Sequence, residues 1–157
     1  MTSTTSSIQR AVPKPMGQKD SSTLIKSDTP TSSTRAVVYV IDSDEEVCNA
    51  LRSLFAGLNA DVECFNSAES FLKLPLNRAR AGCVLLEVNL PGMSGVELLE
   101  RFQKTGFNLP TIVLATYSDV PTAVRAMQAK AVDFIEKPFV DGVLLRRVKE
   151  ALESQQP

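Results

Sequence analysis

The sequence predicts an α/β fold, a doubly wound domain built on a single five-stranded parallel sheet. Short runs of consecutive apolar residues, many of them β-branched, lack the alternation of a half-exposed strand and are typical of strands buried on both faces. Between them lie segments with apolar residues at spacings of three and four, typical of helices that pack on a sheet. Strands and helices alternate from residue 36 onward, and right-handed crossovers turn such alternation into one parallel sheet covered by helices.

The first strand is predicted at residues 36–41, where a β-branched run ends in a cluster of acidic residues. A helix follows, in which Val47, Leu51 and Phe55 belong to an apolar stripe. The same two patterns predict the later elements: strands at 61–65, 81–88, 110–115 and 131–135, and helices at 67–74, 96–103 and 121–129.

Two of the later helices have features of their own. The apolar face of the helix at 121–129 is expected to be Val124 and Met127, among alanines. Asp141 is expected to cap a last helix, in which Leu144 and Val148 belong to a stripe with steps of four.

Residues 1–35 are of a different kind, rich in Ser and Thr and interrupted by Pro13, Pro15 and Pro30. Such a segment cannot bury enough apolar surface to offset the entropy of ordering it. We predict a disordered tail at 1–35, one folded domain at 36–153 and a C-terminal end at 154–157. The tail is either a plain solvated segment or a site of phosphorylation or partner binding.

Length and composition exclude several classes of protein. At 157 residues the chain is long enough for one domain with a substantial core and short for two. A formal net charge of −1 argues against direct nucleic-acid binding through bulk basic charge. The absence of histidine excludes Ser-His and Cys-His nucleophiles and a phosphohistidine of the chain's own.

Cysteines and hydropathy bear on location. Cys48, Cys64 and Cys83 lie in apolar segments without metal-ligand spacing, and an odd number of buried thiols suits a reducing cytosol. No apolar run approaches the length of a membrane span, and the N-terminus lacks the apolar core of a secretory signal. We therefore expect a cytoplasmic protein that does not contact the membrane.

Three predicted strands end in polar residues suited to a common site: Asp42 after the first, Glu87 after the third and Lys137 after the fifth. In the flavodoxin-like strand order 2-1-3-4-5, ligands bind at the carboxyl ends of the strands, where the first and third are neighbours. Each residue alone is equally compatible with an ordinary solvated charge at a strand end. Their common position at one sheet edge favours a charged pocket in which Lys137 neutralises the acids.

Four stretches of the sequence resemble response-regulator receiver domains of the FixJ-type branch. These are Val-Ile-Asp-x-Asp-Glu at 40–45, Leu-Pro-x-Met-Ser-Gly-Val-Glu-Leu-Leu at 90–99, Asp-Val-Pro-x-Ala-Val at 119–124 and Ala-Val-Asp-Phe-Ile-Glu-Lys-Pro-Phe at 131–139. The resemblance covers residues 36–153. It implies a bacterial two-component (phosphorelay) regulator rather than an enzyme.

The resemblance also implies roles for particular positions. In this family a histidine kinase phosphorylates an aspartate at the end of the third strand, and acids after the first strand hold Mg²⁺. A Ser or Thr after the fourth strand and a Lys after the fifth grip the phosphoryl oxygens, and these groups act by positioning and charge neutralisation. Asp42 matches the first acid, Lys137 the lysine, and Phe134 the aromatic switch position.

Other positions depart from the family pattern. Glu87 stands at the position of the acceptor aspartate, Ser43 at that of the second acid, and Ala115 at that of the Ser or Thr. Lys130 replaces a glycine that is usual just before the fifth strand, the easiest residue for a left-handed helix cap.

These departures predict a pseudo-receiver that is no longer phosphorylated. The extra methylene of Glu87 displaces its carboxylate, and a misplacement of roughly 1 Å can cost on the order of a hundredfold in rate. Ser43 removes a charge from the metal site, and Asp44 is a substitute ligand or, in the preferred interpretation, a helix cap. We expect no cofactor and at best weak Mg²⁺ binding, by Asp42, Glu87 and the backbone of Asn89.

The predicted function is phosphorylation-independent protein–protein interaction through the face formed by the fourth helix, fifth strand and fifth helix. The partner would be a sensor kinase, a regulator, an effector protein or a second copy of the chain. The alternative is a receiver that a histidine kinase still phosphorylates, controlling transcription through a partner or a DNA-binding domain absent from this sequence. A nucleotide- or flavin-binding domain is disfavoured because no glycine-rich loop follows the first strand.

Overall fold

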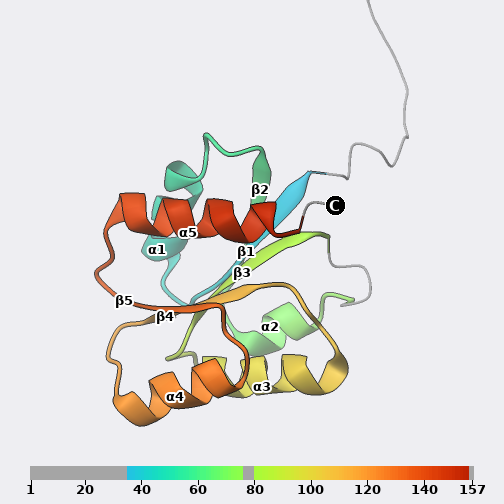
Figure 1. Cartoon of the computed structure of the whole chain (residues 1–157), viewed down its shortest axis with the longest axis vertical. Coiled ribbons are helices and arrows are strands. Elements are labelled where there is room, and N and C mark those ends of the chain that lie inside the picture. The colour runs from blue at the N-terminus through green and yellow to red at the C-terminus, as the bar shows by residue number, and fades with distance from the viewer. Residues whose placement is uncertain (1–34, 76–79, 156–157) are drawn as a thin grey trace, which may run out of the picture. The chain divides into compact units, whose positions relative to one another are not determined.

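The computed structural model describes residues 35–75 and 80–155 (Figure 1). The predicted tail at 1–35 therefore lies, except for Arg35, outside the described residues. Five strands alternate with five helices in the order β1 (Ala36–Ile41), α1 (Glu45–Leu54), β2 (Ala60–Phe65), α2 (Ala68–Leu72), β3 (Gly82–Glu87), α3 (Gly95–Thr105), β4 (Thr111–Ala115), α4 (Val120–Gln128), β5 (Asp133–Glu136) and α5 (Asp141–Glu153).

The strands form one parallel sheet in the order β2-β1-β3-β4-β5, which confirms the predicted fold class. Helices α1 and α5 cover one face of the sheet, and α2, α3 and α4 cover the other (Figure 1). All carboxyl ends of the strands meet at one edge because the strands are parallel. No helix among the described residues is both long and apolar enough to span a membrane.

The sheet separates two apolar cores. Alternate residues of each strand face opposite sides, so Val38 and Val40 of β1 pack with α1 and α5, whereas Tyr39 and Ile41 pack with α2 and α3. Each residue of β3 is buried, as expected of the central strand of a doubly wound sheet.

Side-chain caps define where most helices begin. Asp44 caps α1 by accepting from the amide of Glu46, and Ser67 caps α2 by accepting from the amide of Ser70. The predicted cap of α5 is wrong: Val140 occupies the cap position without a side-chain hydrogen bond, and Asp141 is the first helical residue.

The predicted apolar face of α4 is also wrong. Ala126 is buried, whereas Val120, Val124 and Met127 are 75%, 46% and 49% exposed. Alanine lets the helix approach the sheet closely, so α4 uses its small residues for packing and turns its larger apolar side chains outward. This outward stripe is available for contact with another protein.

The turn before β5 forms without the glycine usual in the resembled family. Lys130 adopts a φ of 73°, in the left-handed region, and its amide donates to the Met127 carbonyl at 3.1 Å. A residue with a Cβ is strained in this conformation, so the substitution is accommodated at an energetic cost.

The expectation of buried free thiols is wrong for two of the three cysteines. Cys48 of α1 and Cys64 of β2 form a disulfide, with their Cα atoms 6.3 Å apart. Sequence spacing does not reveal which side chains of a helix and a strand face each other, and here the packing of α1 on β2 brings the two together. Cys83 of β3 is the buried free cysteine of the described residues.

Candidate functional site

The three charged strand ends meet as predicted. The Lys137 ammonium donates to Asp42 Oδ2 and to Glu87 Oε1, both at 2.7 Å. Asp42 directly follows β1, Glu87 ends β3, and Lys137 directly follows β5. The sheet edge thus holds one cation between two carboxylates.

The sheet topology explains how Lys137 reaches the acids. β1 and β3 are adjacent, so Asp42 and Glu87 are neighbours, but β5 is separated from β3 by β4. Parallel strands lie about 4.8 Å apart, so the long stem of the lysine must cross about 10 Å of sheet edge. The backbone amide of Lys137 donates to the Ala115 carbonyl at 2.8 Å, which holds the lysine against the end of β4.

The site is well shielded from water. The side chains of Asp42 and Glu87 are 3% and 4% exposed, and that of Lys137 is 14% exposed. Burial lowers the pKa of Lys137, but the hydrogen bonds and opposite charges of Asp42 and Glu87 outweigh it and leave that pKa raised. Lys137 is therefore firmly protonated at neutral pH.

Every carboxylate oxygen of the site has a donor from the protein. Asp42 Oδ1 accepts from the amide of Asp44, and Glu87 Oε2 accepts from the amide of Asn89, both at 2.9 Å. Glu87 Oε1 accepts a second hydrogen bond, at 3.1 Å, from the hydroxyl of Thr116. The acids are thus held by both backbone and side chains.

Thr116 is the site residue that the sequence analysis missed. The family pattern places the hydroxyl at position 115, where Ala115 is fully buried and contributes none. The next residue supplies it instead, directly after β4. The signal was present in the sequence as a Thr adjoining the expected position.

The remaining predicted positions do not join the charged cluster. Ser43 is exposed, and Asp44 uses its carboxylate as the cap of α1. Phe134 of β5 is partly buried and packs into the core on the side of α2–α4. The side chains of these residues make no hydrogen bond to Lys137.

Asp42 and Glu87 are the carboxylates of the site that could ligate a divalent ion. The Lys137 ammonium lies between the Asp42 and Glu87 carboxylates and donates to both. Within residues 35–75 and 80–155 no three His, Cys, Asp or Glu side chains are grouped as metal ligands.

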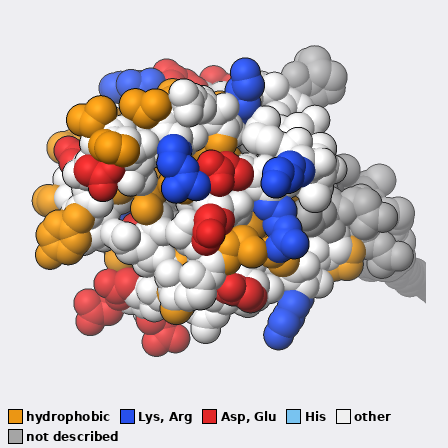
Figure 2. Space-filling model, turned by 90° about the horizontal axis from the view of Figure 1, so that it is seen from below, with side chains coloured by type: hydrophobic (Ala, Val, Ile, Leu, Met, Phe, Trp, Pro, Cys, Tyr) orange, Lys and Arg blue, Asp and Glu red, His pale blue; other side chains and the backbone are white. Residues whose placement is uncertain are grey.

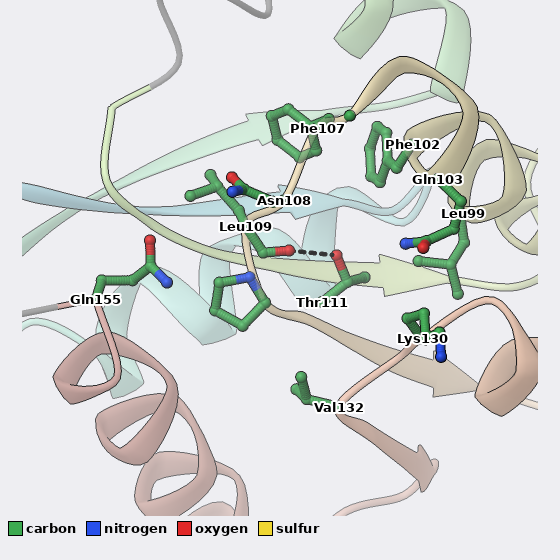
Figure 3. A pocket seen from close by; sticks show the side chains of 12 residues that line it. Leu99, Phe102, Gln103, Phe107, Asn108, Leu109, Thr111, Lys130, Val132 and Gln155 are labelled. Carbon is green, nitrogen blue, oxygen red and sulfur yellow. Dashed lines mark hydrogen bonds between the residues drawn. The ribbon is translucent and has the colours of Figure 1, made fainter.

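Two hollows differ in their relation to this site. A groove of about 510 Å³ is lined by Asp42 and Ser43 together with Cys48 and Cys64. A second hollow of about 370 Å³ lies near Thr111, at the amino end of β4 and so away from the site, where the Thr111 hydroxyl donates to the Leu109 carbonyl (Figure 3).

Apolar side chains are exposed around α4, β5 and the start of α5. Figure 2, viewed from the side of the helices α2–α4, shows hydrophobic side chains gathered toward its left edge, on the side where α4 lies in Figure 1. The large exposed apolar residues are Tyr117, Val120, Val124, Met127, Val132 and Val140. We call this set the α4–β5 patch.

Comparisons with known sequences all indicate the same protein family. The family model described as a response regulator receiver domain matches residues 38–149. The response regulator protein TodT of Pseudomonas putida is 40% identical over 118 residues, which are 75% of this chain and 52% of TodT. The transcriptional regulatory protein FixJ of Bradyrhizobium diazoefficiens is 36% identical over 124 residues, 79% of this chain and 60% of FixJ. The chain thus spans somewhat over half the length of these relatives.

Solved structures agree with the sequence comparison. A response regulator receiver protein from Pseudoalteromonas atlantica has a TM-score of 0.72 at 43% identity, covering 76% of this chain and 99% of that protein. The structure of FixJ-N has a TM-score of 0.70 at 38% identity, covering 78% of this chain and 97% of that one.

Proposed function

The chain belongs to the response regulator receiver domain family, with CheY-like fold and FixJ-type relatives, and on this premise we propose that it is a pseudo-receiver. Receiver domains of this kind serve two-component signal transduction by contacting kinases and effector domains. The proposal is that this one makes its contacts without being switched by phosphorylation.

The observation that supports the proposal most directly is the pair of partners held by Glu87. Its Oε1 atom accepts from both the Lys137 ammonium and the Thr116 hydroxyl. In the resembled family a lysine and a hydroxyl grip the oxygens of the phosphorylated aspartate. The longer carboxylate of Glu87 engages equivalent groups without a phosphoryl group, so the site is already satisfied.

Metal binding is part of the same proposal. Phosphoryl transfer in this family requires Mg²⁺, and Mg²⁺ is held in proteins by carboxylate oxygens and water. Here the oxygens of Asp42 and Glu87 are hydrogen-bonded to protein donors. We expect no saturable Mg²⁺ binding in the millimolar range by calorimetry.

The proposed output surface is the α4–β5 patch together with α5. Val120, Val124 and Met127 are large apolar side chains exposed on a single helix, and such exposure favours a contact site. Val124→Glu should weaken binding of the partner protein or of a second copy, because it places a charge inside the stripe of α4. Lys104→Glu on α3 changes an exposed residue outside the patch and is the matched control.

A small-molecule phosphodonor with Mg²⁺, followed by intact mass measurement, tests the proposal. We expect no phosphoryl adduct on the unmodified chain and little on Glu87→Asp, because Ser43 and Ala115 are unchanged. The triple variant Ser43→Asp, Glu87→Asp, Ala115→Thr should gain the adduct. Stoichiometric labelling of the chain as it stands, or of Glu87→Asp alone, would contradict the proposal.

The second candidate function is a receiver that is still phosphorylated. Thr116 favours it, since its hydroxyl lies 3.1 Å from Glu87 Oε1 and could restore the donor that Ala115 lacks. The same mass measurement separates the two functions, because this candidate requires an adduct that Glu87→Gln abolishes.

A further inference from the structure

We propose that Cys48 and Cys64 form a reversible thiol–disulfide pair that clamps the loop carrying Asp42. This proposal goes beyond the proposed function and does not depend on it. The pair joins the helix α1 to β2, the strand at one end of the sheet order. The cysteines are separated by 16 positions in sequence and lie 6.3 Å apart at Cα, within the usual range for a disulfide.

Both cysteines are adjacent to the hydrogen bonds that hold the loop from Asp42 to Asp44. The amide of Cys48 donates to the Asp44 carbonyl at 3.2 Å, on the helix side of the loop. The amide of Asp42 donates at 2.9 Å to the carbonyl of Phe65, the residue that follows Cys64. A covalent link between the two cysteines therefore ties together the two anchors of the loop.

The loop in turn positions one of the two acids that bind Lys137. Asp42 Oδ1 accepts from the amide of Asp44, and Asp42 Oδ2 accepts from the Lys137 ammonium. Loosening α1 from β2 moves the backbone on which these bonds depend. The redox state of the pair is thereby coupled to the charged site through the hydrogen bonds that hold the loop and those that Asp42 accepts.

Small reagents have a route to the pair. The groove of about 510 Å³ is lined by both cysteines and by Arg52, and Cys64 is only partly buried. Thiol–disulfide exchange requires such access, because the attacking thiolate must reach a sulfur of the disulfide. Cys83 is the contrast: it is fully buried, and burial raises the pKa of its thiol to about 12, so it should be inert.

The reaction partner is a low-molecular-weight disulfide such as oxidised glutathione. The thiolate of one cysteine attacks the glutathione disulfide, forms a mixed disulfide and releases one glutathione thiolate. The second cysteine then attacks its neighbour's sulfur and releases the second glutathione. The two cysteines lose two electrons and two protons in total, and the glutathione disulfide gains them as two thiols.

Thiol counting on the full chain tests the chemistry. After equilibration with reduced or oxidised glutathione, the chain is quenched in acid, denatured and alkylated, and its mass is measured. We expect all three cysteines to be alkylated after reduction and only Cys83 after oxidation. Cys48→Ser and Cys64→Ser should each stop at the mixed disulfide and retain one glutathione, whereas Cys83→Ser should form the internal disulfide as the unmodified chain does.

Amide hydrogen exchange tests the clamp, and it uses the unmodified chain, so no variant has to fold. On reduction, the amides of Asp42, Asp44 and Cys48 should exchange at least about tenfold faster than the loss of global stability alone explains, with the amides of β3 as the reference for that loss. Equal rates for the loop amides in both redox states would overturn the clamp. Alkylation of all three cysteines after exposure to oxidised glutathione would overturn the pair itself.

Discussion

In the unmodified chain, Glu87→Gln should be destabilising. In a chain that also carries Lys137→Met, the same substitution should be stabilising. In the unmodified chain, Glu87→Gln replaces a buried carboxylate that accepts hydrogen bonds from Lys137, Thr116 and Asn89. Its loss should lower the free energy of unfolding by about 1–3 kcal/mol, the usual range for a buried charged hydrogen-bond partner. Once Lys137 is replaced, Asp42 and Glu87 are two buried carboxylates without a cation.

The magnitude follows from burial. Breaking a buried ion pair from one side costs about 3–5 kcal/mol, because it leaves an uncompensated charge away from water. With the Asp42 and Glu87 side chains 3% and 4% exposed, Lys137→Met should fall in this range. Glu87→Gln should then recover part of the loss, so we expect a coupling energy of about 2–4 kcal/mol between the two sites.

Urea unfolding of the unmodified chain, both single variants and the double variant measures this coupling. The surface pair of Arg125 and Glu100 is the matched control, since its side chains are 52% and 41% exposed and solvent screens their attraction. Its cycle of Arg125→Met and Glu100→Gln should show little coupling and no change of sign. If Glu87→Gln were equally destabilising with and without Lys137, Glu87 would not be part of a charge-balanced site, and the comparison with a phosphorylated aspartate would fail.

Three further predictions concern single positions. Thr116→Val should lower the free energy of unfolding by about 1–2 kcal/mol in urea titrations, because Glu87 loses a hydrogen-bond donor, whereas Thr116→Ser should retain stability. Lys130→Gly should raise the free energy of unfolding by about 1 kcal/mol, and with it the thermal midpoint, because glycine adopts a φ of 73° without strain. An unchanged midpoint would refute the strain. Cys83 has a folded pKa of about 12 against an ordinary value of 9.0, so stability is full below pH 9 and about 4 kcal/mol is lost as the pH rises toward 12. Cys83→Ala should flatten that alkaline decline in unfolding experiments from pH 8 to 11, and an identical slope would contradict the assignment.

The convergence of Asp42, Glu87 and Lys137 was predictable from the sequence because it follows from topology. Parallel strands end at one edge, the strand order makes β1 and β3 neighbours, and a residue just past a strand must lie at that edge. No side-chain conformation has to be known for this inference. The family resemblance did not require side-chain conformations either, because it rests on local sequence motifs.

Other features required the tertiary structure because they depend on which side chains face each other. Thr116 binds Glu87 since the backbone turns after β4 and directs the hydroxyl of residue 116, rather than a side chain at 115, over the end of β3. The pairing of Cys48 with Cys64 depends on how α1 is rotated against β2. Packing decides how a helix is rotated on the sheet and how the chain turns after a strand. One sequence pattern is compatible with several such rotations and turns.

The helix α4 shows most clearly what the sequence determined and what only the tertiary structure decided. Its sequence alone predicted a helix at 121–129, opened by Pro121 and rich in alanine, close to the observed Val120–Gln128. Hydrophobicity then favoured Val124 and Met127 as its apolar face, but Ala126 is the buried residue, and Val124 and Met127 are 46% and 49% exposed. The tertiary structure therefore decided that the larger residues face solvent, because close packing selects side chains by volume as well as by polarity.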